Sequence, residues 1–168
     1  RALCAALESG DTPDAVTPLA PSQAGSHVVR VGDGLLHVVT AGPPSRAARL
    51  VLPPLPGDIF AAVERQVRTH PKARIVALSL PGCGWSDPLA CDDVMAGTLA
   101  ALDEALRALG VAPMALAGEG AACVLARAWS KRNNWKFPVE VIDPPAWANG
   151  GAAPQAALLT RMAPRWDG

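Results

Sequence analysis

The chain has 168 residues, of which 50% are hydrophobic and 18% charged, and its 15 Lys and Arg residues balance 15 Asp and Glu residues. This composition excludes a disordered chain, the length suffices for one domain with a core, and zero net charge provides no basic surface for nucleic acid or an anionic membrane. No apolar run reaches the roughly 20 residues of a membrane-spanning helix and no export signal is visible, so we expect a soluble, cytoplasmic protein without nucleic-acid or membrane partners.

The first element that the sequence predicts with clarity is a β-hairpin. Residues 1–25 are rich in Ala, Pro, Ser and Asp without sustained periodicity, which predicts an N-terminal extension with a short helix at most. Residues 27–31 and 35–40 are β-rich runs on either side of a Gly-Asp-Gly turn at 32–34. Residues 48–53 predict the next strand.

Strands and helices alternate from residue 48 onward. Further strands are predicted at 74–79, 113–117 and 139–142. Helices are predicted at 59–70, with Asp58 as the N-terminal cap, and at 92–109 and 121–132. This order indicates a mainly parallel sheet with helices on both faces, in which ligands bind at the carboxyl ends of the strands. The loops at those ends are residues 53–58, 81–88, 118–122 and 143–147.

One strand and the turn after it carry a family resemblance. Residues 75–88 read Ile-Val-Ala-Leu-Ser-Leu-Pro-Gly-Cys-Gly-Trp-Ser-Asp-Pro and resemble the D-x-P-G-x-G-x-S-D-P segment of the α/β-hydrolase superfamily, with Ser79 where Asp is common. The hairpin, the Leu-Pro-Gly loop at 55–57 and the Val-Ile-Asp-Pro-Pro run at 141–145 fit in order and spacing. The resemblance covers about residues 26–147 and implies the α/β-hydrolase-like form of the α/β class.

The nucleophile elbow implied by this resemblance is degenerate. In the family a G-x-S-x-G turn exposes the nucleophile between a strand and a helix. Aligning Gly118 with the first glycine puts Gly120, which has no nucleophile, at that position. A frame shifted by one would make Glu119 a carboxylate nucleophile, but it places two large side chains where the following helix needs small ones. In the first frame we expect Glu119 at the pocket rim or at the helix N-terminus.

The rest of a catalytic triad is also missing from the predicted core. The family order is nucleophile, acid, then His, whereas His27, His37 and His70 all precede the elbow and are most simply strand or surface residues. Asp143 ends the strand after the elbow helix, where some members of the family keep their catalytic acid. An Ile-Asp-Pro ending is also a common structural feature of that strand, so both interpretations of Asp143 stay open.

The resemblance further implies an oxyanion hole and a pocket wall. The backbone N–H groups would come from Leu55 and Ala121, although Pro53-Pro54 replaces the family's His-Gly pair. Trp147 lies where a cap would meet the pocket. We expect no metal or organic cofactor, because the four cysteines form no CxxC pair or Cys/His cluster, and we expect Cys123 to be a core residue.

The resemblance implies more chain than these elements supply. Residues 26–147 correspond to the first part of an α/β-hydrolase core, and residues 148–168 to the start of a cap region. A sheet that ends with the strand at 139–142 has an open edge, whose unpaired backbone groups favour pairing with another strand. We therefore expect the remainder of the fold as a second chain or a further segment, and an oligomer is a further alternative.

Three functions stay open at this point, each with a small-molecule substrate or ligand. The first is a hydrolase acting on a small ester, lactone, amide or acyl compound, with the catalytic His and acid outside this chain. The second is a non-catalytic homologue that binds a ligand or serves as an assembly subunit, because Gly120 replaces the nucleophile. The third is a carboxylate-nucleophile hydrolase using Glu119 together with Asp143. Whether the protein is an enzyme is thus undecided.

Overall fold

A six-stranded sheet with the strand order β1-β2-β4-β3-β5-β6 organises the chain, of which the computed structural model describes residues 24–45, 47–55 and 57–149. The elements are β1 (Ala24–Val31), β2 (Gly34–Ala41), β3 (Ala47–Leu52), α2 (Ile59–Thr69), β4 (Ile75–Leu78), α3 (Val94–Ala108), β5 (Ala112–Glu119), α4 (Ala122–Arg132), β6 (Val139–Ile142) and the 3₁₀ helix η1 (Ala146–Asn149). The N-terminal extension predicted for 1–25 and the cap region predicted for 148–168 lie outside the described residues, except at their inner ends.

The sheet is mixed but mainly parallel, as the alternation of strands and helices predicts. β1 pairs with β2 and β2 pairs with β4, both antiparallel, whereas β4, β3, β5 and β6 form a parallel set. The carboxyl ends of these four strands therefore lie at one edge, where the loops after β3, β4, β5 and β6 meet.

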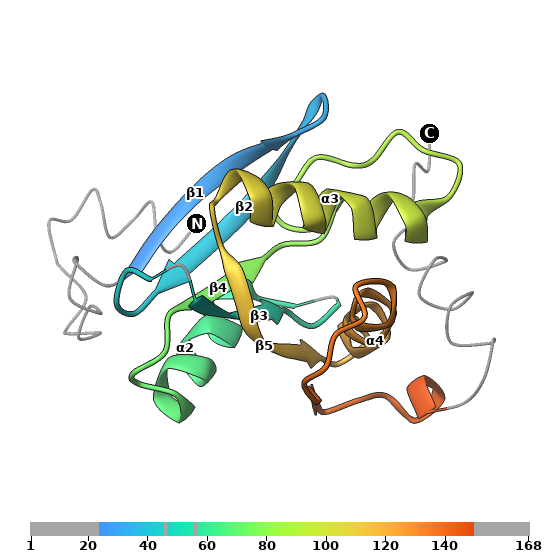
Figure 1. Cartoon of the computed structure of the whole chain (residues 1–168). Helices are drawn as coiled ribbons and strands as arrows, with labels where there is room; N and C mark the ends of the chain where they lie inside the picture. Colours follow the sequence, from blue (N-terminus) through green and yellow to red (C-terminus); the bar gives the residue numbers. More distant parts are fainter. Residues whose placement is uncertain (1–23, 46, 56, 150–168) are drawn as a thin grey trace, which may run out of the picture.

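Helices cover both faces of the sheet, and the side-chain alternation of the central strands shows why. On β3, Leu50 and Leu52 belong to the core beneath α3 and α4, whereas Val51 belongs to the core beneath α2. β4 divides its side chains between the two cores in the same way. A strand buried on both faces needs apolar residues throughout. Figure 1 shows α2 on one side of these strands and α3 on the other.

Local signals set the helix ends. The Asp58 carboxylate accepts a hydrogen bond from the Phe60 N–H at 2.8 Å and caps α2, as predicted. The α3 helix starts later than its predicted first residue, 92, because Asp93 caps it by accepting a bond from the Ala96 N–H at 2.9 Å. Gly110 follows α3 with a φ of +62°, the left-handed conformation that ends many helices.

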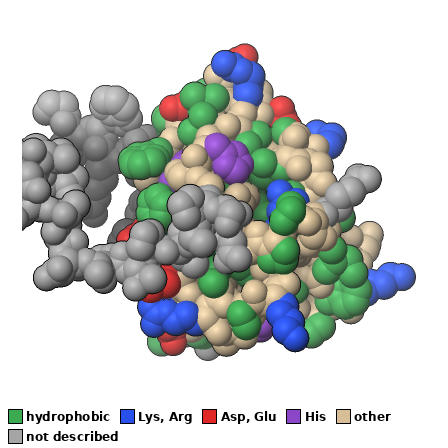
Figure 2. Space-filling model, turned by 90° about the vertical axis from the view of Figure 1, so that its left-hand side faces the viewer, with side chains coloured by type: hydrophobic (Ala, Val, Ile, Leu, Met, Phe, Trp, Pro, Cys, Tyr) green, Lys and Arg blue, Asp and Glu red, His purple; other side chains and the backbone are tan. Residues whose placement is uncertain are grey.

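The surface carries both charge signs. On the face shown in Figure 2, the described Lys, Arg, Asp and Glu side chains lie scattered among apolar ones, and neither sign dominates. This distribution agrees with the net charge of zero. None of the helices that the structure describes has the length and apolar character needed to cross a membrane.

The α4 helix packs unusually close to the end of β5, and Gly118 permits it. A Cβ atom at position 118 would lie 2.7 Å from the Ala126 Cβ and 2.7 Å from the Cys123 Cα. Such contacts leave no room for a methyl group, so any side chain at this position has to push the helix away from the sheet.

We therefore expect Gly118→Ala to lower the free energy of unfolding by about 1–3 kcal/mol, the usual cost of overpacking a core. Urea denaturation measures the change. Gly25→Ala in β1 is the matched control, because its Cβ would meet nothing closer than the Thr40 Oγ1 at 3.5 Å. Equal denaturation midpoints for the two variants would show that α4 does not need the glycine.

Candidate functional site

The loops after β3, β5 and β6 enclose a pocket of about 330 Å³. Its lining residues are Pro54, Leu55, Arg65, Glu119, Gly120, Ala121, Asp143 and Pro145. The structure thus brings together every site residue named from the sequence except Trp147. That side chain is half-buried and packs against the core beneath α3 and α4, so it does not line this pocket.

The elbow is a sharp turn of two residues, Gly120 and Ala121, between β5 and the start of α4. β5 continues through Glu119, so the turn is shorter than the predicted one at 118–120. Gly120 has a φ of +54°, and its N–H donates a 2.8 Å hydrogen bond to the Ile142 carbonyl at the end of β6. A nucleophile elbow holds its central residue on a strained turn, so this backbone favours the frame that has Gly120 at the nucleophile position.

Pro54 occupies the space beside Gly120. A Cβ atom at position 120 would lie 3.3 Å from the Pro54 Cβ and 3.7 Å from the Pro54 Cα. The first distance is shorter than an ordinary van der Waals contact, so Pro54 has to move by a few tenths of an ångström before any side chain fits. The two departures from the family pattern, at the elbow and at the loop after β3, therefore lie side by side.

Two backbone donors lie in the same pocket. Within residues 24–45, 47–55 and 57–149, neither the Leu55 N–H nor the Ala121 N–H finds a hydrogen-bond acceptor. Unpaired N–H groups at this place are what an oxyanion hole supplies to a substrate oxygen. The proline pair before Leu55 has not removed the Leu55 donor, so both predicted N–H groups are present and lack an acceptor within the described ranges.

The Glu119 side chain is buried, although the residue is part of the pocket lining. It is only 1% exposed, and its carboxylate accepts bonds from the Arg65 Nη1 at 2.8 Å and the Gln66 Nε2 at 3.4 Å. The reason is strand alternation: Gly118 faces α4, so Glu119, the next residue of β5, faces α2 on the other side of the sheet. The sequence interpretation placed Glu119 in a turn, whereas β5 continues through it.

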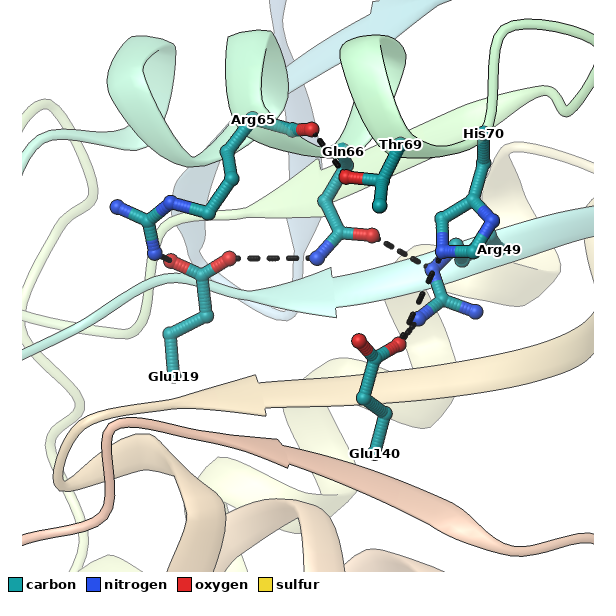
Figure 3. Close-up of polar contacts among 7 residues, drawn as sticks. All are labelled: Arg49, Arg65, Gln66, Thr69, His70, Glu119 and Glu140. Atoms are coloured by element: carbon teal, nitrogen blue, oxygen red, sulfur yellow. Dashed lines mark hydrogen bonds and ion pairs between the residues drawn. The ribbon is translucent and has the colours of Figure 1, made fainter.

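A row of polar side chains continues from Glu119 across the α2 face of the sheet (Figure 3). The Gln66 Oε1 accepts a 2.6 Å bond from the Arg49 Nε, and the Arg49 guanidinium also pairs with Glu140 of β6. The His70 Nε2 lies 3.9 Å from the same Glu140 carboxylate. Burial lowers the pKa of Arg49 from its ordinary value, and burial with the nearby Arg49 charge lowers that of His70.

Sequence reasoning missed this row and, with it, Arg65 in the pocket. The one available signal was Gln66, a polar residue on the helix face whose other buried members are Ile59, Ala62 and Val63. A buried amide needs hydrogen-bond partners. The sequence does not show that those partners come from β3 and β5.

Asp143 reaches the pocket from the end of β6. It is exposed and has a φ of +48°, a left-handed conformation that Asp tolerates better than most residues. The described histidines lie elsewhere, and none lines the pocket. His37 is 2% exposed, with its ring nitrogens 2.9 Å from the Ser26 Oγ and 3.3 Å from the Ser79 Oγ, and burial together with His27 lowers its pKa.

Neither a metal cluster nor an activated thiol stands out in this part of the chain. No group of three or more His, Cys, Asp or Glu side chains within the described ranges is arranged to hold a metal ion. Cys123 is fully buried in the core, as predicted. Burial raises the pKa of the Cys83 and Cys123 thiols, which disfavours the reactive thiolate.

Comparison with family models and with curated proteins found no match, whereas solved structures do match. Cfl2 from Burkholderia cenocepacia aligns with a TM-score of 0.64 and 22% identity over 73% of this chain and 42% of its own. The thioesterase domain from the curacin biosynthetic pathway aligns at 0.62 and 20% over 83% and 53%. The haloalkane dehalogenase DatA from Agrobacterium tumefaciens C58 aligns at 0.61 and 20% over 73% and 42%.

These likenesses show the fold. The described part of the chain has the architecture of an α/β-hydrolase fold, which confirms the fold class that the 75–88 motif implies. The chain spans about half the length of the solved structures that it matches, or less. It therefore corresponds to part of that fold.

Removal of the Glu119 carboxylate tests its structural role. We expect Glu119→Ala to lower the free energy of unfolding by about 1–3 kcal/mol, because the buried Gln66 amide and the Arg65 guanidinium lose their acceptor. Glu64→Ala, which breaks the exposed pair between Glu64 and Arg68, is the control and should cost less than about 1 kcal/mol. Urea denaturation compares the two, and an unfolding midpoint for Glu119→Ala no lower than that of the control would contradict this role.

Proposed function

We propose that this chain is a non-catalytic α/β-hydrolase-fold protein whose pocket binds a small molecule. The observation that carries the proposal is the position of Pro54 in the space that a side chain at Gly120 would need. The nucleophile position has no reactive side chain, and the neighbouring proline lies 3.3 Å from where a Cβ atom would be. The pocket keeps a volume of about 330 Å³ and two unpaired N–H groups within the described ranges, which suits binding of a small ligand.

The buried position of Glu119 argues against a carboxylate nucleophile. A nucleophile has to meet the substrate, whereas this side chain is 1% exposed and both of its oxygens are engaged by α2 side chains. Its companion in that mechanism, Asp143, is exposed on a different part of the pocket wall.

The second candidate is a hydrolase acting on a small ester, lactone, amide or acyl compound, with a catalytic His and acid supplied from outside this chain. The left-handed turn at Gly120 favours it, as do the N–H groups of Leu55 and Ala121, which find no acceptor among the described residues. The solved structures with this fold include a thioesterase domain and a haloalkane dehalogenase. This candidate still needs a nucleophile that Gly120 does not provide.

The remainder of the fold is the partner that we propose for the open edge of the sheet. Among the described strands β6 pairs only with β5, so one side of its backbone is unpaired. An open parallel edge is a template for a further strand, from a second chain or from a further segment.

We accordingly expect the 168-residue polypeptide to self-associate, or to bind a dye that reports exposed apolar surface. Light scattering after size-exclusion chromatography and dye fluorescence measure the two properties. A monomer that unfolds cooperatively and binds no dye would contradict the proposal for the β6 edge. It would leave the pocket proposal unchanged.

A panel of short acyl esters tests the absence of catalysis. We expect no turnover above buffer by the full chain, because Gly120 offers no nucleophile. Turnover by the unmodified protein would overturn the proposal. A second arm tests Gly120→Ser alone and combined with Pro54→Gly, which removes the proline beside the new side chain. Turnover that appears only in these variants would show that the other catalytic groups are present and that only the nucleophile is lacking.

Gly32→Ser is the matched control for these variants. Gly32 has a φ of +55°, close to that of Gly120, but a Cβ atom there meets nothing within 4 Å. Both serines pay the cost of a left-handed backbone, so a difference between the two variants reports the pocket alone. The control should show no ester turnover in any combination.

A further inference from the structure

Arg65 is the one cationic side chain among the described residues that line the pocket. It projects from α2, the helix beneath the opposite face of the sheet from α4. Its side chain is 46% exposed, and the residue is part of the pocket lining. Neither of the two candidate functions described above assigns a role to Arg65.

Buried side chains hold the Arg65 guanidinium through hydrogen bonds. Its Nη1 donates to the Glu119 Oε2 at 2.8 Å, and Glu119 is itself 1% exposed. The other Glu119 oxygen accepts from Gln66, whose side-chain oxygen is bonded to Arg49 (Figure 3). This succession of bonds limits the positions that Arg65 can take, which lowers the ordering cost of binding a ligand.

Most of the Arg65 donors remain available. A guanidinium carries five N–H donors, and within the described ranges Glu119 is the only acceptor that contacts it. The planar fork of Arg matches the two oxygens of a carboxylate. The Leu55 and Ala121 N–H groups add neutral donors to the same pocket.

The acidic groups of the pocket restrict the charge of the ligand. Asp143 is exposed on the wall and Glu119 lies behind Arg65, so the lining carries two carboxylates against one guanidinium. The Asp143 carboxylate repels a phosphate dianion more strongly than it repels an anion with a single charge. A monoanion that places its charge on Arg65 and an apolar tail against Pro54 and Pro145 fits the lining better.

We propose that Arg65 is the specificity-determining residue of this pocket and binds the carboxylate of a small organic acid. This inference rests on the proposed function, namely that the pocket binds a small molecule without turning it over. It names the class of ligand and assigns a role to the row of polar side chains behind the pocket, which positions Arg65.

The test measures binding of butyrate, of its neutral analogue butyramide and of inorganic phosphate to the full chain at constant ionic strength. Calorimetry or the amide chemical shifts of Gly120 and Ala121 report the binding. We expect butyrate to bind at least about tenfold more tightly than butyramide, the ratio expected when a charge-assisted bidentate contact replaces a neutral one. Phosphate should bind more weakly than butyrate.

Variants of Arg65 identify the contact. Arg65→Lys keeps the charge without the fork and should weaken butyrate binding about tenfold. Arg65→Gln combined with Glu119→Gln leaves no buried carboxylate unpaired and should bind butyrate no better than butyramide. Arg68→Gln is the control, because Arg68 lies one turn along α2, pairs with Glu64 and is absent from the pocket lining. Circular dichroism confirms that each variant is folded.

The outcomes separate this inference from the proposed function. Equal binding of butyrate and butyramide, tighter binding of phosphate, or full butyrate affinity in the folded double variant would overturn the role of Arg65 and leave a ligand-binding pocket. Failure of all three probes to bind would also overturn the inference. Ester turnover by the unmodified protein would instead overturn the proposed function.

Discussion

The close approach of α4 to the end of β5 shapes the part of the pocket that Glu119, Gly120 and Ala121 form. Gly118 lets the helix touch the strand, so the chain can turn sharply at Gly120 and enter α4 two residues later. Strand alternation then sends the Glu119 side chain to the opposite face, against α2. The lack of a side chain at Gly118 thus permits the elbow, in which the Ala121 N–H finds no acceptor among the described residues. It also brings the Glu119 carboxylate against Arg65.

The fold could be predicted from the sequence because the signals for its helices and strands are local. Asp58 caps α2, Gly110 ends α3, and the apolar run of β4 reflects burial on both faces. The end of β5 was not predictable for a physical reason: whether a strand continues for two more residues depends on its pairing partner, here β6, which pairs with β5 up to Glu119 and Ile142. Local pattern carries no information about that register.

The candidate site was readable in part. Its backbone-determined members, Leu55, Gly120 and Ala121, follow from the order of strands and turns, and they meet in one pocket. Arg65 and the side chains behind it depend on contacts of α2 with β3 and β5, and on a contact between β3 and β6. The proximity of Pro54 to the place of a side chain at position 120 likewise could not be predicted from the sequence, although both residues depart from the family pattern.

The hydrogen bond from the Gly120 N–H to the Ile142 carbonyl ties the elbow to β6, an edge strand of the described sheet. Edge strands open more readily than central ones, since they are held on one side only. The order of the elbow therefore depends on a strand that, among the described strands, pairs only with β5. Any loss of order in β6 would reach the turn at Gly120 through this bond.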